Sequence, residues 1–572
     1  MYVGDKYLTV SHLKRQIENH LKDTLLASNE KAINQPTLNT NDVILPGCRR
    51  IGKSPDSNYA YFIFEDDVGY ENGKSILCSV QNKGKRWVDV LVEASDLKNF
   101  TKNSSERENH ANRELEKKRQ LETTQEDDSS SMAVSPWADI PYEQQIKRKR
   151  RHCMRVLKRI ASQVIPGEKK VESEKSNCYS VLEVIPSVKP ERYRNRVDYS
   201  IGSRDDSESV APKPCVGFNA GAYKNGYRKV TKLSPCVITP EVLQNIAGEV
   251  ELWMQSWWKN HPLVLKGYDK ETHHGFWRRL SMRISADDQI MIALQTMSSS
   301  WLHKALVDNE ECSIDSTALF AVLQEDFAQV FSSMCTSLQW QEFDGISNAA
   351  PSDLPYKSLH GPLTIVDHVD GKGFQISANS FFQVNTSAME LLVRRLYALP
   401  FIHKNTVLLD ICSGTGLIGL SLHDRVHRVI GVEMTASAVD DARENASNMH
   451  ATNVHYICDK VENCYEQIQS AIYETMHSTE TALEGTEVVA IVDPPRSGLH
   501  KNVIKWLRRL KLINKLVYIS CDQSALVRDA VLLLKPPSIA YPGDPFNGTS
   551  SFAVDFFPHT PHVEQVFIME RQ

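Results

Sequence analysis

Four short apolar runs in the C-terminal third of the chain each end in a chemically reactive residue, and this pattern constrains the fold more than any other. The runs are Thr406–Asp410, Arg428–Glu433, Val488–Asp493 and Leu516–Cys521. Apolar runs of this length are typical of strands that are buried on both faces of a parallel sheet. Such a sheet binds ligands at the carboxyl ends of its strands. We therefore predict an α/β fold whose C-terminal domain has a doubly wound, mainly parallel, Rossmann-like sheet with one reactive edge.

The segment after the first run has the features of a cofactor-binding loop. Ile411–Gly416 lies between a predicted strand and a predicted helix, and Gly414 and Gly416 permit a tight turn and close approach of the backbone to a ligand. Glu433 follows Asp410 by 23 residues, a spacing that suits a carboxylate binding ribose hydroxyls. A third glycine is missing, which favours an adenosyl cofactor without a pyrophosphate over a dinucleotide.

Cys521 is the candidate nucleophile, because it follows a buried strand and precedes a turn and a helix. A lone cysteine in such a position is usually inert core, and its partners are what distinguish it. Asp493–Arg496 supplies a loop at the same edge. Thr560, His562 and Glu564 alternate, so in a strand they would share one face and offer a base.

Several classes of protein are excluded by the cysteines and by the hydropathy pattern. The 12 cysteines are scattered without a C-x-x-C pair, which speaks against zinc knuckles, iron–sulfur clusters and a disulfide framework, so no metal is predicted. No apolar run approaches the ~20 residues of a membrane span, and charged residues interrupt the first segment from Asp5 onward. We expect no membrane span and an intracellular protein with reduced thiols, located in nucleus and cytoplasm.

Residues 1–96 read as a module similar to an RNA recognition motif. The strand predicted at Asn58–Phe64 carries Tyr59 and Tyr61 at alternating positions, where they would face outward and stack RNA bases. The two positions before Tyr59 hold serine and asparagine, where the motif normally has a basic residue and a glycine. A protein-binding version of the module therefore stays open.

Three further segments complete the predicted organisation. Residues 97–136 are rich in Ser, Asn, Glu and Lys and read as a flexible charged linker. Residues 137–373 are predicted to form a central α+β domain that binds the RNA substrate, because basic residues alternate with other residues in Tyr193–Tyr199 and aromatic residues are mixed with arginine in Gly275–Leu280. Residues 374–572 hold every catalytic candidate.

A basic helix is expected at the start of the central domain. Tyr142–Ile160 carries eight Lys and Arg residues against one Glu. Its run Lys147–Arg151 fits a phosphate-binding stripe, a nuclear signal or an ordinary solvated helix face.

Taken in order, these motifs resemble the S-adenosylmethionine-dependent RNA uracil-5 methyltransferase family. The matching stretches are Ser377–Asn385, Asp410–Gly416, Asp493–Arg496, Ser520–Cys521 with Arg528–Asp529, and Asp555–Glu564, with Tyr193–Arg196 and Gly275–Arg278 resembling its central domain. The likeness covers about Trp137 to Arg571.

The resemblance implies methyl transfer to carbon 5 of a uridine, most simply the T-loop uridine of tRNA. It implies that Cys521 forms a covalent adduct at carbon 6 and that Glu564 accepts the proton from carbon 5. Implied contacts to S-adenosylmethionine are Gln383, Cys412, Gly414, Glu433 and Asp493, and implied contacts to RNA are Arg194, Arg196 and Arg496, with Tyr59 and Tyr61 in the first module.

Alternatives remain at this level. A cytosine-5 methyltransferase would have a cysteine in the Asp493–Arg496 loop, and an amino-group methyltransferase usually ends that loop in an aromatic residue. A ribosomal RNA uracil-5 methyltransferase and a tRNA-binding folding factor with little catalysis both stay open. Asp522 beside Cys521 is expected to disfavour the thiolate unless its carboxylate points away or is paired.

Overall fold

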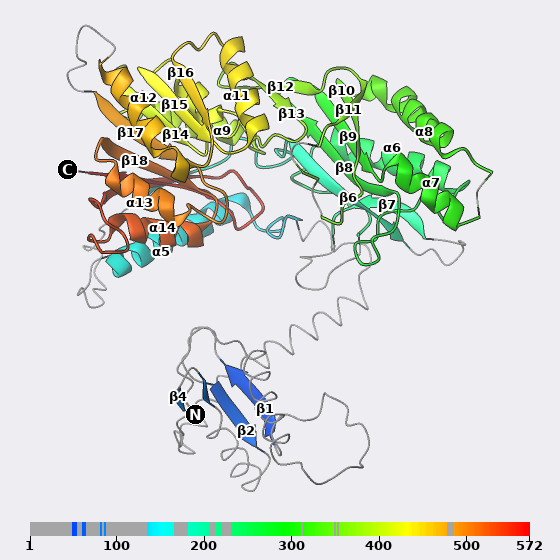
Figure 1. Ribbon diagram of the computed structural model, residues 1–572, viewed down its shortest axis with the longest axis horizontal. Coiled ribbons are helices and arrows are strands. Elements are labelled where there is room, and N and C mark those ends of the chain that lie inside the picture. The colour runs from blue at the N-terminus through cyan, green and yellow to red at the C-terminus, as the bar shows by residue number, and fades with distance from the viewer. Residues whose placement is uncertain are drawn as a thin grey trace. The chain divides into compact units, whose positions relative to one another are not determined.

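The structure is a computed structural model of the 572-residue chain, which divides into two compact units, 1–124 and 125–572 (Figure 1). It describes residues 134–164, 181–204, 212–219, 230–310, 313–347, 350–351, 354–477 and 486–571, and the backbone of 48–53, 60–64, 81–82 and 85–86. Within these residues no helix combines the length and the apolar character that crossing a membrane requires.

In the first unit the described backbone forms two antiparallel pairs. They are β1 (Cys48–Lys53) with β2 (Ala60–Phe64), and β3 (Gln81–Asn82) with β4 (Lys85–Arg86). The strand predicted around Tyr61 is confirmed in β2, where Tyr61 pairs with Gly52. Tyr59, the side chain of Tyr61 and nearly all of the predicted linker lie outside what the structure describes. The likeness of this unit to an RNA recognition motif stays a prediction.

The C-terminal lobe of the second unit is built around an eight-stranded mixed sheet. In spatial order its strands are β16 (Val454–Cys458), β15 (Arg428–Glu433), β14 (Thr406–Ile411), β17 (Glu487–Val492), β18 (Ile513–Ser520), β20 (Glu564–Glu570), β19 (Asn547–Val554) and β5 (Val181–Ile185). The first five are parallel, and β20 runs antiparallel to both of its neighbours. The predicted α/β fold with a mainly parallel sheet is confirmed, including all four strands that the apolar runs indicated.

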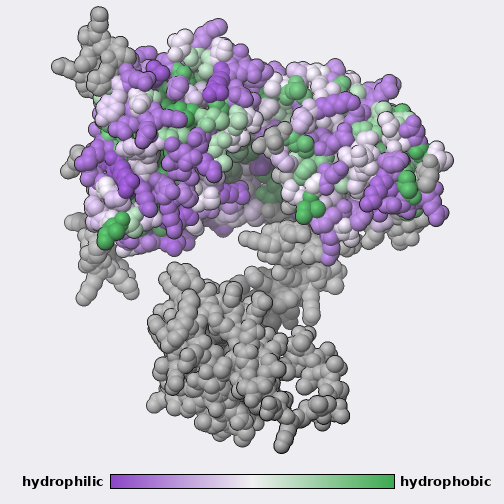
Figure 2. Space-filling model, in the orientation of Figure 1, coloured by the Kyte–Doolittle hydropathy of each residue, from purple (hydrophilic) through white to green (hydrophobic). Residues whose placement is uncertain are grey.

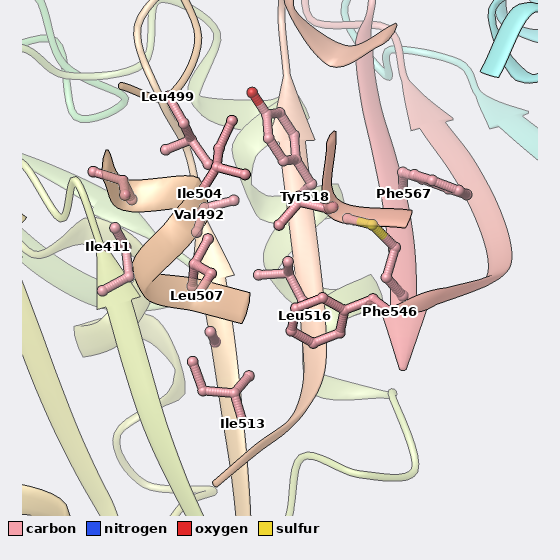
Figure 3. Packing of buried hydrophobic residues seen from close by; sticks show 14 of the residues in the cluster. Ile411, Val492, Leu499, Ile504, Leu507, Ile513, Leu516, Tyr518, Phe546 and Phe567 are labelled. Atoms are coloured by element: carbon pink, nitrogen blue, oxygen red, sulfur yellow. The ribbon is translucent and has the colours of Figure 1, made fainter. Parts of the chain in front are cut away.

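Helices cover both faces of this sheet, which explains why its central strands are apolar throughout. One face carries α5 (Tyr142–Val164), α12 (Tyr465–His477), α13 (Lys501–Arg509) and α14 (Gln523–Leu534), and the other carries α9 (Thr386–Tyr397), α10 (Leu417–Leu422) and α11 (Ala436–Asn448). Figure 3 shows Ile504 and Leu507 of α13 packed beside Val492 of β17 and Leu516 of β18. Burial of these side chains fixes the sheet between two helical layers.

The central lobe is an α+β structure, as predicted. Its six-stranded sheet has the order β11 (Lys357–His360), β10 (Ser337–Glu342), β9 (Ile290–Thr296), β8 (Trp277–Ile284), β6 (Arg196–Arg204) and β7 (Lys213–Gly217). Helices α6 (Glu241–Trp258), α7 (Ser299–Asp308) and α8 (Ser316–Phe331) pack on one face over an aromatic core that includes Trp253, Trp277 and Trp340. The opposite face carries polar and charged side chains such as Asp198, Arg279 and Gln295, besides a small apolar cluster at Met291 and Ala293.

A hairpin of β12 (Thr364–Val369) and β13 (Lys372–Ser377) joins the two lobes. Phe374 belongs to the core of the C-terminal lobe, whereas Ile365 packs against the central sheet. The boundary expected between residues 373 and 374 therefore falls inside this hairpin. The segment from residue 137, expected in the central domain, instead contributes α5 and β5 to the C-terminal lobe. Sequence order alone does not reveal which sheet a strand joins when its partner lies far along the chain.

A fully buried ion pair fastens α5 to the C-terminal lobe. The Lys149 ammonium lies 2.5 Å from the Asp555 carboxylate, and neither side chain is exposed. Tyr142 donates a hydrogen bond to the same carboxylate, and Lys149 donates a second one to the Phe557 carbonyl at 2.9 Å. Burial lowers the pKa of Lys149, and the neighbouring Asp555 opposes this shift. The pair thus ties α5 to the segment that leads into β20.

Replacing Lys149 by methionine is expected to destabilise the protein by about 3–5 kcal/mol, because it leaves the Asp555 carboxylate buried without its counter-charge. Urea denaturation monitored by circular dichroism measures the effect. The double variant Lys149→Met/Asp555→Asn is expected to recover part of the loss, because it removes the unpaired charge. Equal stability of the single variant and the parent protein would contradict this account of the pair.

Candidate active site

The four reactive residues predicted at strand ends lie along one edge of the C-terminal sheet. Asp410 is near the end of β14 and Glu433 ends β15, while Asp493 and Cys521 directly follow β17 and β18. Because these strands are parallel neighbours, their carboxyl ends meet at the same edge. The predicted convergence is therefore confirmed as an arrangement of the backbone.

The loop between β14 and α10 has three residues in the left-handed region, with φ of +63° at Cys412, +55° at Gly414 and +78° at Gly416. A Cβ atom at Gly416 would lie 2.2 Å from the Tyr456 hydroxyl, whereas one at Gly414 would meet nothing within 4 Å. The Glu433 carboxylate accepts a hydrogen bond from the Gly414 amide at 3.2 Å. Burial, followed by the negative charge of Glu433, raises the pKa of Cys412 to about 12. Cys412 contributes one of the three left-handed backbone positions that shape this loop.

A buried carboxyl group, that of Asp410, and a half-buried one, that of Asp493, lie at this edge. The Asp410 carboxylate accepts a hydrogen bond from the Gly419 amide at 2.9 Å, and burial raises the pKa of Asp410 to about 7. The Gln383 side chain donates to the Asp493 carboxylate at 3.4 Å, so the structure brings these two predicted residues together. Burial and the charge of Asp410 raise the pKa of Asp493. Asp410 was not predicted among the cofactor contacts, although its position at the end of an apolar run identifies it as a residue of this edge.

Cys521 and Glu564 lie next to each other where the neighbouring antiparallel strands β18 and β20 end and begin. Ser520 at the end of β18 pairs with Gln565 of β20, so the adjoining residues Cys521 and Glu564 lie across from one another. Burial raises the pKa of the half-buried Cys521 thiol to about 11, and the charges of Glu564 and Asp493 add to this shift. The two residues predicted to be the nucleophile and the base thus lie near each other, and their roles stay predictions.

Glu564 is 2% exposed, and its Oε1 atom has no hydrogen-bond partner among the described residues. Burial, followed by the charge of Asp493, holds the pKa of Glu564 well above its ordinary value. The expectation that Thr560 and His562 share a strand face with Glu564 is wrong, because β20 begins only at Glu564. The Thr560 hydroxyl donates to the Phe557 carbonyl and accepts from the His562 amide, and these bonds form a turn before the strand.

Asp522 has a paired carboxylate, which is the exception that the sequence analysis left open. Its carboxylate accepts a hydrogen bond from the Ala525 amide at 2.8 Å and caps the N-terminus of α14. The acids that raise the pKa of Cys521 are Glu564 and Asp493, from other strands. The carboxylate next to the nucleophile is therefore paired.

The three arginines that the sequence predicted as RNA contacts differ in their exposure and in their partners. Arg496 is exposed just beyond β17, and it is the positive charge that opposes the raised pKa of Cys521. Arg194 is half-buried. Arg196 forms an ion pair with Asp198 at 3.1 Å and donates a hydrogen bond to the Ser380 carbonyl at 3.3 Å. Arg196 thus already helps to join the lobes.

A cavity of about 260 Å³ lies on the polar face of the central sheet. Its lining includes Lys270, Arg278 and Arg279, which are absent from the predicted site residues. The Arg278 guanidinium lies over the ring of Tyr268, with 4.0 Å between its carbon and the ring centroid. The mixture of aromatic residues and arginine in Gly275–Leu280 was the signal for this basic surface. Among the described residues, no three His, Cys, Asp or Glu side chains are grouped to hold a metal ion.

The chain is similar to several known proteins. Residues 363–572 match the family described as tRNA (Uracil-5-)-methyltransferase. The chain is 30% identical over 467 residues to tRNA (uracil-5-)-methyltransferase homolog A of Mus musculus, covering 80% of this chain and 72% of that relative. Against homolog A of Homo sapiens the identity is 31% over 452 residues, covering 77% and 67%.

A solved structure shares the fold. It is that of Pyrococcus abyssi tRNA (uracil-54, C5)-methyltransferase in complex with S-adenosyl-L-homocysteine, with a TM-score of 0.52 and 21% identity. The match covers 78% of this chain and 87% of that chain.

The raised pKa of Cys521 predicts how its reactivity depends on pH. Because the thiolate is the reactive form, alkylation of Cys521 is expected to accelerate about tenfold per pH unit from pH 7 toward the pKa of about 11. Peptide mass spectrometry after timed exposure to iodoacetamide separates Cys521 from the other cysteines. Glu564→Gln should shift the profile to lower pH, because it removes a negative charge across from the thiol. A profile that levels off below pH 9 in the parent protein would refute the stated electrostatics.

Proposed function

Since the chain belongs to the tRNA (uracil-5-)-methyltransferase family, we propose that it transfers a methyl group from S-adenosylmethionine to carbon 5 of a uridine in tRNA. The observation that carries this proposal is the pair of Cys521 and Glu564, which lie opposite each other at the ends of β18 and β20. A nucleophile and a base in that relation suit a reaction that adds to a ring carbon and later removes a proton from its neighbour.

The chemistry of uracil explains why these residue types are needed. Carbon 5 of uracil is a weak nucleophile, and addition of the Cys521 thiolate to carbon 6 makes it electron-rich. After methylation, carbon 5 still carries its hydrogen, which must leave as a proton so that the Cys521–carbon 6 bond can break. Glu564 is the proposed acceptor of that proton, and its raised pKa means that its carboxylate holds a proton more firmly than an ordinary one.

The residues at the strand ends fit S-adenosylmethionine. When bound, this cofactor supplies a methyl group on a positively charged sulfur. Asp410, Glu433 and Asp493 give the edge a negative character, and the Oδ1 atom of Asp410 has no hydrogen-bond partner among the described residues. The open space beside Gly414 leaves room for close approach of a ligand to the backbone. In this proposal Gln383 and Asp493 orient the cofactor, with Glu433 holding the Cys412–Gly416 loop in shape.

The proposed substrate is a uridine in the T loop of tRNA. Arg496, at the opening of the site, and the basic cavity of the central lobe are proposed as RNA contacts. Arg194, Arg196, Tyr59 and Tyr61 remain proposed RNA contacts. A ribosomal RNA uridine is the alternative substrate, and a tRNA-folding role without catalysis is the alternative function. Nucleoside analysis of tRNA and ribosomal RNA from cells with and without the protein separates the three.

Cys521→Ala is expected to abolish methyl transfer to tRNA, because it removes the thiol that is proposed to add to carbon 6. Cofactor binding is expected to stay within about twofold of the parent protein. Methyl transfer is measured with radiolabelled S-adenosylmethionine and binding by calorimetry. Turnover at the parental rate in this variant would reject Cys521 as the nucleophile.

Glu564→Gln is expected to separate methyl transfer from product release. Glutamine cannot accept the proton from carbon 5, so the methylated RNA should remain covalently attached to Cys521. Denaturing gel electrophoresis detects the adduct as a protein band of increased mass that requires both RNA and cofactor. Undiminished product release without an adduct would argue against Glu564 as the base.

A further inference from the structure

Helix α5 has one buried face and a large surplus of exposed positive charge. Its buried residues are Gln145, Lys149, Cys153, Val156, Leu157 and Ile160. Of its eight Lys and Arg residues only Lys149 is buried, and the others are exposed to solvent. Hydrophilic residues predominate on the face of the C-terminal lobe seen in Figure 2. The packing of α5 thus leaves seven cations free of the core.

Helical spacing divides these cations between two sides of α5. Arg148, Arg155 and Arg159 line one flank together with His152, because their separations of four, three and four residues match the period of an α-helix. We call the three arginines the α5 stripe. They extend over roughly 16 Å, from 11 residues at about 1.5 Å each. Within the described residues none of the three has an ion-pair partner.

The flank that carries the α5 stripe borders the active site. The side chain of His152 is hydrogen-bonded to Gln523, the first residue of α14 and two positions after Cys521. Gln523 in turn donates to the carbonyl of Val563 at 2.9 Å, directly before Glu564. Gln523 therefore links His152, on the flank that carries the α5 stripe, to the two segments that contain Cys521 and Glu564.

Arg496 is the exposed cation between the stripe and the thiol. His562, exposed beside the same edge, lies within electrostatic range of Arg496, Lys149, Asp522 and His152, and burial lowers its pKa, so it offers hydrogen bonds rather than a positive charge near pH 7. Arg496 also acts on Cys521 itself. A polyanion that reaches the thiol from this side therefore meets the three arginines of the stripe and then Arg496.

The helix is already fixed before any partner arrives. The Lys149–Asp555 pair is one attachment, and the Gln145 side chain is a second, donating to the Ile140 carbonyl at 2.8 Å and accepting from the His559 amide at 2.7 Å. A nuclear signal must be read as an accessible basic peptide, whereas Lys149, in the middle of the run, is buried in an ion pair. The rigid helix favours a phosphate-binding surface, because binding then orders few side chains.

We propose that the α5 stripe binds the phosphates of the RNA strand next to the target uridine and leads that strand past Arg496 into the active site. This inference rests on the proposed function, and it assigns to α5 a substrate-positioning role. Strand phosphates and arginines suit each other because guanidinium groups donate paired hydrogen bonds to phosphate oxygens. Salt-dependent affinity for tRNA follows directly.

Two triple variants with equal loss of charge test the proposal in the full chain. Arg148→Ala/Arg155→Ala/Arg159→Ala removes the stripe, and Lys147→Ala/Arg150→Ala/Lys158→Ala removes three exposed cations from the other sides of the same helix. The stripe variant is expected to bind unmodified tRNA at least about tenfold more weakly. The slope of log K against log salt should fall by roughly 2–3, as expected for three lost phosphate contacts. The control variant should stay within about threefold of the parent affinity.

Binding is measured by filter retention without cofactor, and the rate of methyl transfer is measured separately over a range of tRNA concentrations up to saturation. The stripe variant should keep its kcat within about twofold while its KM rises, and Arg-to-Lys changes at the three positions should restore most of the affinity. Equal weakening in both variants, or in neither, would overturn the proposal. Normal tRNA binding by a parent protein that methylates nothing would instead refute the proposed function, while the affinities would still decide the role of the stripe. Unchanged thermal unfolding verifies that all variants are folded.

Discussion

The direction of one strand determines whether this chain has an active site. Strand β20 runs antiparallel to β18, so the beginning of β20 lies beside the end of β18. Glu564 and Cys521, 43 residues apart in the sequence, therefore meet at the edge where the parallel strands deliver Asp410, Glu433 and Asp493. Had β20 been parallel to β18, its first residue would lie at the opposite edge, remote from the thiol.

The same edge concentrates groups that are unfavourable together. Asp410, Asp493 and Glu564 all have a pKa raised by burial and by neighbouring negative charge, and the Cys521 thiol is affected in the same way. A folded protein gains nothing in stability from such a cluster, and perturbed groups of this kind gather at functional sites. A positively charged sulfonium ligand relieves the repulsion between the carboxylates. The negative charge of this edge therefore favours the binding of a cationic ligand.

Local signals in the sequence predicted the parts of the site that depend on local structure. The apolar runs identified β14, β15, β17 and β18, and the glycines identified the loop at Gly414 and Gly416, because burial and left-handed φ values leave direct marks on residue choice. Positions that depend on distant partners were not predictable, such as the pairing of β5 with β19 and of Lys149 with Asp555. Within the catalytic edge, hydrogen bonds with nearby backbone groups decided two further details: Thr560 forms a turn before β20, and Asp522 caps α14.

The return of α5 and β5 to the C-terminal lobe has a consequence for how the protein is made. Val181 of β5 pairs with Ser551 of β19, and Lys149 pairs with Asp555, so both partnerships span several hundred residues. A ribosome releases α5 and β5 long before β19 exists, and the whole central lobe emerges in between. The apolar face of α5 therefore stays exposed until β19 and the segment around Asp555 have been synthesised. Chaperone dependence during translation, rather than fragility of the finished protein, is the vulnerability that this topology creates.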